Sequence, residues 1–166
     1  MIIGIDASRA NRPNKTGTEW YSYYLIRWLA KLDDKNEYIL YTDKPLTGGL
    51  VDLTTTQHND DVFSPVKVDK KGRQQIKSPH GNFQAEILKW PFNYFWTLAR
   101  LSMTMLKRKP DILFIPAHTM PLIYPKKTII TIHDVGFARE NCLYDTEKMG
   151  PDNVGGKKII NFLLNL

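Results

Sequence analysis

The chain of 166 residues lacks the sequence features that mark disulfide-rich, membrane-spanning or secreted proteins. It contains a single cysteine, Cys142, which excludes an internal disulfide framework and favours a reducing compartment. No apolar run approaches the roughly 18 residues of a membrane-spanning helix. The opening MIIGIDAS has no basic segment and reaches an aspartate at position 6, unlike a secretory signal. We therefore expect a cytoplasmic protein.

The signatures of metal, nucleotide and serine chemistry are also missing. The four histidines are scattered, and the sequence has no C-x-x-C or H-E-x-x-H spacing. It has no Asp-x-Asp pair of the kind that holds a divalent cation on a nucleotide diphosphate, no Walker loop, no G-x-G-x-x-G and no G-x-S-x-G. We expect neither a metal nor a bound cofactor.

What the chain does have is the composition of one ordinary globular domain, with 42% hydrophobic and 24% charged residues. Its formal charge of +6 would attract anionic partners such as phosphorylated substrates, nucleic acid or an acidic membrane. Mild basicity without a specific partner is just as common, so the charge alone does not choose among these.

Apolar runs alternate with segments of helical period. Trp20, Tyr24 and Trp28 recur every four residues in a wide apolar stripe, which predicts a helix. Thr16 and Glu19 have capping-box spacing at its start. The predicted strands are residues 2–6, 37–42, 62–68, 111–116 and 127–134.

Further helical segments are predicted later in the chain. One begins near Gln84, is interrupted at Pro91 and resumes until Pro110, and another begins at residue 157. The basic segment 69–83 is predicted to be a loop. This alternation predicts an α/β fold: a Rossmann-like, doubly wound, mostly parallel sheet with helices on both faces. In such sheets ligands bind at the carboxyl ends of the strands, near the switch in strand order.

That rule directs attention to three segments. The first is the loop-to-helix junction at Thr16, Gly17 and Thr18, where a helix N-terminus could hold a phosphate or an oxyanion. The residues alone favour the simpler interpretation, in which Gly17 is a turn residue and Thr16 a cap.

The other two segments carry histidines. His133 ends an apolar strand, and either a proton-transferring or a backbone-satisfied imidazole fits there. Asp134 cannot easily bond its neighbour's ring and fits a cap of the next turn. His118 follows the strand at residues 111–116 in a proline-bounded connector, where a site residue and a rigid linker are both consistent with the sequence.

A membrane-contacting segment is a further hypothesis. Lysines and aromatics mix between Lys70 and Arg108, and Lys89 with Trp90 suits an interface with anionic lipid. For Phe92, Phe95 and Trp96 the helical spacing favours burial in the core.

Taken in order, several segments resemble one family. They are an opening IIGIDAS, a loop ending in T-G-x-E-x-Y, the helix YSYYLIRWLAKL, then PDILFIPAHTMPL and KTIITIHDVGF. This order resembles the N-terminal domain of family 4 (group 1) glycosyltransferases, over about residues 1–10, 16–42 and 110–137. Those are retaining, metal-independent enzymes of the GT-B fold, in which two Rossmann-like domains face each other.

The resemblance implies roles for the candidate residues. Thr16, Gly17 and Thr18 would lie against the donor phosphates or the acceptor. His133 would be the catalytic residue near the reacting sugar, Asp134 would bind substrate beside it, and His118 would line the acceptor side. The enzyme would transfer a sugar from a nucleotide-sugar to a hydroxyl acceptor, in the synthesis of a cell-surface polysaccharide or glycolipid.

The family's donor-binding domain is not found in residues 1–166. We therefore expect the chain to be the acceptor-side domain alone, truncated and inactive by itself, with the missing domain, the donor and the acceptor as partners and no nucleic acid. It would be cytoplasmic, or peripheral at the inner face of the membrane. Two alternatives stay open: a non-catalytic basic and aromatic module that binds an anionic lipid or polymer, and a nucleotide-sugar epimerase of GT-B shape.

Overall fold

The computed structural model describes residues 1–51, 69–76, 78–92 and 95–133. The chain divides into two compact units, Met1–Ile132 and His133–Leu166, and only His133 of the second unit is among the described residues. The predicted strand at 62–68, the predicted helix from residue 157 and Asp134 therefore lie outside them.

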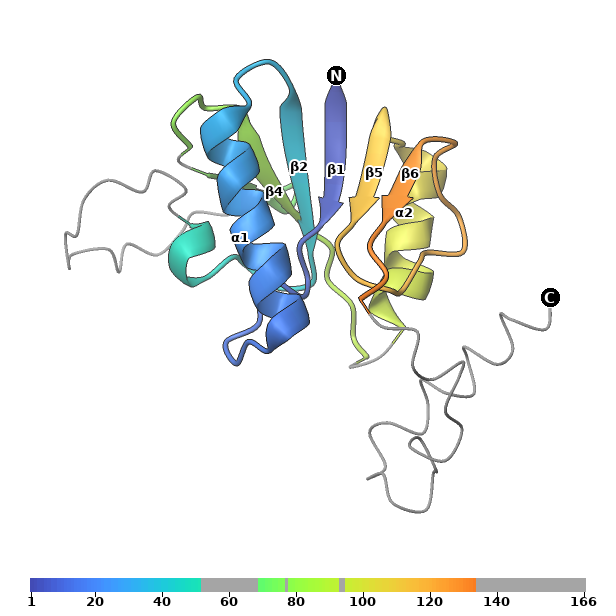
Figure 1. The fold of residues 1–166 in the computed structure, drawn as a ribbon. Coiled ribbons are helices and arrows are strands. Elements are labelled where there is room, and N and C mark those ends of the chain that lie inside the picture. The colour runs from blue at the N-terminus through green and yellow to red at the C-terminus, as the bar shows by residue number, and fades with distance from the viewer. Residues whose placement is uncertain (52–68, 77, 93–94, 134–166) are drawn as a thin grey trace. The chain divides into compact units, whose positions relative to one another are not determined.

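The first unit is built on a sheet that, within the described residues, has six strands in the order β3-β4-β2-β1-β5-β6 (Figure 1). Neighbouring strands are parallel except for the antiparallel pair β3 and β4. The strands are β1 (Ile2–Asp6), β2 (Glu37–Thr42), β3 (Arg73–Gln75), β4 (Phe83–Ile87), β5 (Ile112–Ile115) and β6 (Thr128–Ile130). The predicted α/β class and mostly parallel sheet are confirmed. So are the strands at 2–6 and 37–42, while β5 and β6 are shorter than predicted.

Helices lie on both sides of this sheet. In Figure 1, α1 (Gly17–Leu32) crosses one face, and α2 (Ser102–Lys107) lies on the other. A π-helical segment, η2 (Trp96–Leu101), leads directly into α2, and a short 3-10 turn, η1 (Gly48–Leu50), follows β2.

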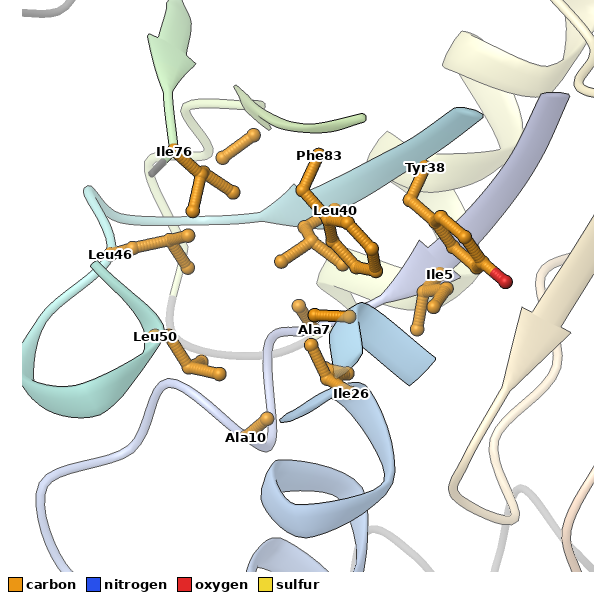
Figure 2. Packing of buried hydrophobic residues seen from close by; sticks show 12 residues of the cluster. Ile5, Ala7, Ala10, Ile26, Tyr38, Leu40, Leu46, Leu50, Ile76 and Phe83 are labelled. Atoms are coloured by element: carbon orange, nitrogen blue, oxygen red, sulfur yellow. The ribbon is translucent and has the colours of Figure 1, made fainter. Parts of the chain in front are cut away.

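Each face of the sheet has its own apolar cluster, because successive strand residues point to opposite faces. Ile5, Leu40 and Ile26 meet in the cluster beneath α1, as Figure 2 shows. Leu113 and Met105 belong to the second cluster, beneath α2. Strands β2 and β5 have residues in both clusters and are therefore covered from both sides, as strands of parallel sheets are, whereas β6 has no buried residue.

The helical start predicted near Gln84 is wrong, whereas the helix predicted after Pro91 is confirmed by η2 and α2. Residues 83–87 form β4, which is parallel to β2 with Phe83 opposite Tyr38 and Ile87 opposite Thr42. Phe83, Ala85 and Ile87 alternate with polar residues at period two, which is the pattern of a strand. The loop predicted for 69–83 likewise contains β3.

The helix predicted from Trp20, Tyr24 and Trp28 is confirmed as α1, and so is its capping box. These three side chains are nonetheless exposed. The residues that α1 buries are Glu19, Ser22, Ile26 and Ala30. The side of the helix with the largest side chains thus does not face the sheet.

Candidate functional site at the strand ends

The carboxyl ends of β1, β2 and β5 lie at the same end of the sheet because these strands are parallel. The chain passes from β1 to β2 on one side and later returns to place β5 on the other side of β1. The switch in strand order therefore lies between β1 and β5, which is where open α/β sheets bind ligands. We call residues 6–19, Ser22 and residues 116–119 the strand-end rim.

Asp6 ends β1 at this rim and is 3% exposed. One carboxylate oxygen accepts hydrogen bonds from the Ser8 N–H at 3.0 Å and from its hydroxyl at 2.6 Å, and the other accepts from the Thr97 hydroxyl at 3.1 Å. Burial raises the pKa of Asp6, although these hydrogen bonds and the nearby Arg9 act in the opposite direction. A buried carboxyl group with a raised pKa is thus held at the mouth of β1.

Glu19 is the second acidic group of the rim and is 4% exposed. Its carboxylate accepts from the N–H of Thr16 at 3.1 Å and from the Thr16 hydroxyl, and it lies 3.5 Å from both Arg9 and Arg12. Burial acts to raise the pKa of Glu19, but the hydrogen bonds from Thr16 and the Arg9 charge outweigh it and lower the pKa. Glu19 therefore stays ionised and fixes two arginines beside the start of α1.

Ser22 joins the two halves of the rim. Its hydroxyl lies 2.8 Å from the carbonyl oxygen of Thr18 and 3.2 Å from that of Pro116. The start of α1 and the segment that follows β5 are therefore adjacent, so two of the three segments chosen from the sequence lie together.

The start of α1 leaves space in front of its backbone. Thr16 and Gly17 are exposed, and a Cβ atom built on Gly17 would have no atom within 4 Å. Thr18 is half-buried and His118 is exposed. The unpaired N–H groups and partial positive charge of a helix N-terminus, with two arginines nearby, make this end of α1 electropositive.

The loop after β2 is fixed to the rim by Asn11, which is buried. The Asn11 amide nitrogen lies 3.0 Å from the Pro45 carbonyl oxygen and 3.3 Å from the Thr42 hydroxyl, and its oxygen accepts from the Thr47 N–H at 2.9 Å. The hydrogen bonds of the Asn11 side chain thus hold the loops after β1 and β2 together.

His133 lies three residues beyond the end of β6 and is exposed. It belongs to the second unit, so the described geometry joins only the Gly17 and His118 segments. Asp134 is outside the described residues. The catalytic role of His133 remains a prediction.

The segment predicted to contact a membrane is only partly exposed. Lys89 is exposed, and its carbonyl oxygen accepts from Arg100 at 3.2 Å. Trp90 is half-buried against the second cluster and lies edge-on to Phe92 at 5.4 Å. The prediction of core positions is right for Trp96, which is buried, and wrong for Phe92 and Phe95, which are exposed. They lie in a turn and at the cap of η2, outside the helical period.

Sequence reasoning missed Asp6, Arg9, Arg12 and Ser22 as parts of the rim. Asp6 could have been found from the sequence, because it is a carboxylate at the end of an apolar strand and ligands bind at the carboxyl ends of strands in this fold class. The arginines could not have been found in this way, because their pairing with Glu19 depends on how the loop folds back on α1.

Within the described residues, no group of three or more histidine, cysteine, aspartate or glutamate side chains could hold a metal ion. No described helix is long and apolar enough to cross a membrane. Comparison of the chain with protein-family models, with curated proteins and with solved structures finds no match.

Proposed function

We propose that this chain is the acceptor-side, N-terminal domain of a retaining, metal-independent glycosyltransferase of GT-B architecture, with a Rossmann-like, doubly wound sheet. The observation that carries the proposal is the Ser22 hydroxyl, which joins the start of α1 to the segment after β5 at the switch in strand order. The same two segments hold the sequence motifs that resemble the family.

The chemistry of the rim suits an anionic donor. In the proposed reaction the bond from the anomeric carbon to the nucleoside diphosphate breaks, a bond from that carbon to the acceptor hydroxyl oxygen forms, and the hydroxyl proton passes to the leaving diphosphate. The N-terminus of α1, with Arg9 and Arg12, offers positive charge to the developing diphosphate. The open space in front of Gly17 lets a ligand approach the backbone. His133 would orient or stabilise the reacting sugar.

The test uses a protein that carries this domain together with a donor-binding domain. Incubated with a panel of nucleotide-sugars and hydroxyl acceptors, it should form a product that retains the anomeric configuration, and a chelator should not reduce the rate. His133→Ala should lower kcat/KM by at least about a hundredfold, as the loss of a proton-transferring or charge-stabilising group does.

His80→Ala is the matched control. His80 is exposed and its Nε2 lies 3.4 Å from the carbonyl oxygen of Lys31, in the last turn of α1 and far from the start of that helix. The His80→Ala variant should have the same turnover as the unchanged protein. Residues 1–166 alone should be inactive. Turnover by the isolated chain, a requirement for a divalent cation, or full activity of His133→Ala would each contradict the proposal.

A second candidate is a non-catalytic module for an anionic lipid or polymer. The exposed aromatic side chains of α1 and the lysines beside them favour it. This candidate is supported if the chain binds vesicles or polymer and shows no transfer activity, either alone or together with a donor-binding domain.

A further inference from the structure

α1 presents a row of large apolar side chains on the side away from the sheet. Trp20, Tyr24, Trp28 and Leu32 follow one another at intervals of four residues and are 44, 53, 56 and 76% exposed. We call these four residues the α1 ridge. Contiguous exposed apolar side chains of this size mark a surface that contacts something else.

The ridge is ordered, and lysines flank it. The rings of Trp20 and Tyr24 stack with centroids 5.5 Å apart at an interplanar angle of 22°. The ammonium group of Lys15 lies 5.5 Å from the Trp20 ring, and that of Lys31 lies 4.8 Å from the Trp28 ring. A positive charge therefore lies beside the aromatic rings at each end of the ridge.

Among the described residues of α1, none on this side carries a negative charge. The only acidic residue within the helix is Glu19, which is buried and paired with Arg9 and Arg12. Arg27 adds a further positive charge to the helix, and the aspartates that follow α1, Asp33 and Asp34, lie past its carboxyl end. The surface is apolar and cationic, and its complement is apolar and anionic.

We propose that the α1 ridge docks on the anionic surface of a lipid bilayer. Tryptophan and tyrosine rings sit at the depth of the headgroups, where their apolar bodies reach the acyl chains, and lysines meet the lipid phosphates. An anionic bilayer matches both the rings and the ammonium groups of the ridge. Lys89 and Trp90 fit this role less well, because Trp90 is half-buried against the second cluster.

Docking in this way has a consequence for the rim. The first turn of α1 is part of the strand-end rim, so a docked α1 holds that rim close to the lipid. If the proposed function is correct, the acceptor is then a hydroxyl group on a membrane-anchored lipid. This consequence rests on the proposed function, whereas the docking itself does not.

The experiment measures co-sedimentation of the full chain with vesicles of phosphatidylcholine, with and without phosphatidylglycerol. The chain should bind only the anionic vesicles, with a shift of tryptophan emission to shorter wavelength. Trp20→Ala/Trp28→Ala should lower the partition coefficient by at least about tenfold, because two rings no longer enter the interface. Lys15→Gln/Lys31→Gln should lower it about twentyfold in low salt.

Two double variants serve as comparisons. Met103→Ala/Leu106→Ala removes exposed apolar side chains from α2, on the opposite face of the sheet, and should bind as the unchanged chain does. Lys89→Ala/Trp90→Ala should also bind normally. Because the ridge side chains are exposed, circular dichroism should show an unchanged fold in Trp20→Ala/Trp28→Ala.

Three results would overturn the proposal. They are no binding to any vesicle, loss of binding only in Lys89→Ala/Trp90→Ala, and a stable dimer in solution that dissociates in Trp20→Ala/Trp28→Ala. The last would make a second copy of the chain the occupant of the ridge. None of these measurements depends on transfer activity, so docking and the proposed function can fail separately.

Discussion

Two carboxylates at the strand-end rim have pKa values displaced in opposite directions, although both are buried. Asp6 is surrounded by hydroxyl and amide donors, which do not offset the cost of burying its charge, so its pKa is raised. At Glu19 the hydrogen bonds from Thr16, with a smaller contribution from the charge of Arg9, outweigh burial, so its pKa is lowered. At Asp6 burial is the larger effect, although Arg9 acts on this carboxylate too. Asp6 is therefore the carboxyl group of the rim that is more easily protonated.

We predict that Asp6→Asn removes a pH-dependent loss of stability. A raised pKa means that the folded state binds the proton more tightly than the unfolded state, so the charged aspartate lowers the free energy of unfolding as the pH rises above its ordinary value of 3.8. Asparagine is always neutral. Its oxygen can keep both bonds from Ser8, and its amide can donate to the Thr97 hydroxyl.

The measurement is urea unfolding of both proteins between pH 3.5 and pH 7, in steps of about half a unit. The free energy of unfolding of Asp6→Asn minus that of the unchanged chain should increase with pH and then level off. Taking this difference cancels the effects of the other carboxylates. A difference that is constant or decreases with pH would mean that burial does not dominate at Asp6.

At the scale of the element, the sequence predicts that α1 exists but not which side it buries. The period of four shared by Trp20, Tyr24 and Trp28 is a helical period, and the capping box places the start correctly. A helix packs closely on a sheet where its side chains are small, and Ser22 and Ala30 provide that side. An apolar stripe alone cannot show whether it faces a core or an external surface.

The error at β4 has a different cause. The run from Phe83 to Ile87 is short, so a few residues with helical spacing downstream were enough to extend a helix into it. The alternation of Phe83, Ala85 and Ile87 with Gln84 and Glu86 was the stronger local signal. It also fits the register, because Phe83 stacks on Tyr38 of β2 with ring centroids 4.3 Å apart.

Two glycine substitutions compare a closely packed position in β1 with a position at the start of α1 that has free space around it. A Cβ atom on Gly4 would lie 2.7 Å from Cε2 of Tyr41 and 2.9 Å from Cγ of Pro110, whereas one on Gly17 would meet nothing within 4 Å. Both Gly→Ala changes reduce the entropy of the unfolded chain alike. We expect Gly4→Ala to lower the free energy of unfolding by about 1–3 kcal/mol.

Gly17→Ala should leave that free energy unchanged or raise it by up to about 1 kcal/mol, since alanine favours a helix. Urea unfolding of both variants at one pH is the measurement. Equal destabilisation by the two changes would show that the space in front of Gly17 is closed. If the Gly17→Ala variant is as stable as the unchanged chain but binds ligand less well, the substitution acts on the binding site and not on folding.

At the scale of the whole molecule, the parallel alternation of strands and helices was predictable, but the order of the strands was not. The rule that ligands bind at carboxyl ends needs only parallel strands, so the sequence could place the Gly17 and His118 segments at one end of the sheet. The position of the switch depends on β5 returning beside β1, which is set by contacts between distant residues. No local pattern around Ile112–Ile115 encodes its neighbour.

A local cluster of hydrogen bonds at the carboxyl end of α1 contributes to the response of the whole domain to acid. The Asp33 carboxylate, at the end of α1, accepts hydrogen bonds from Asn36 and from the Tyr38 hydroxyl of β2 at 2.7 Å, and the backbone of Asp33 accepts from Asn82 at 2.9 Å. The side chain of Asn36 is the largest cause of the lowered pKa of Asp33, followed by Tyr38. One carboxylate thus links α1 to the start of β2.

We therefore predict that acid destabilises the domain in part through Asp33. A lowered pKa contributes stability that is present above the unfolded value of 3.8 and is lost progressively as the pH falls below it. The midpoint of thermal unfolding should fall between pH 5 and pH 2. Asp33→Asn should be less stable than the unchanged chain at pH 6, and the difference between the two should shrink steadily as the pH falls from 4 to 2. Asp34→Asn, which removes the same charge from the adjacent position, is the control variant. Parallel curves for Asp33→Asn and the unchanged chain across the whole pH range would show that the Asp33 hydrogen bonds contribute equally in both protonation states, contrary to the linkage argued here.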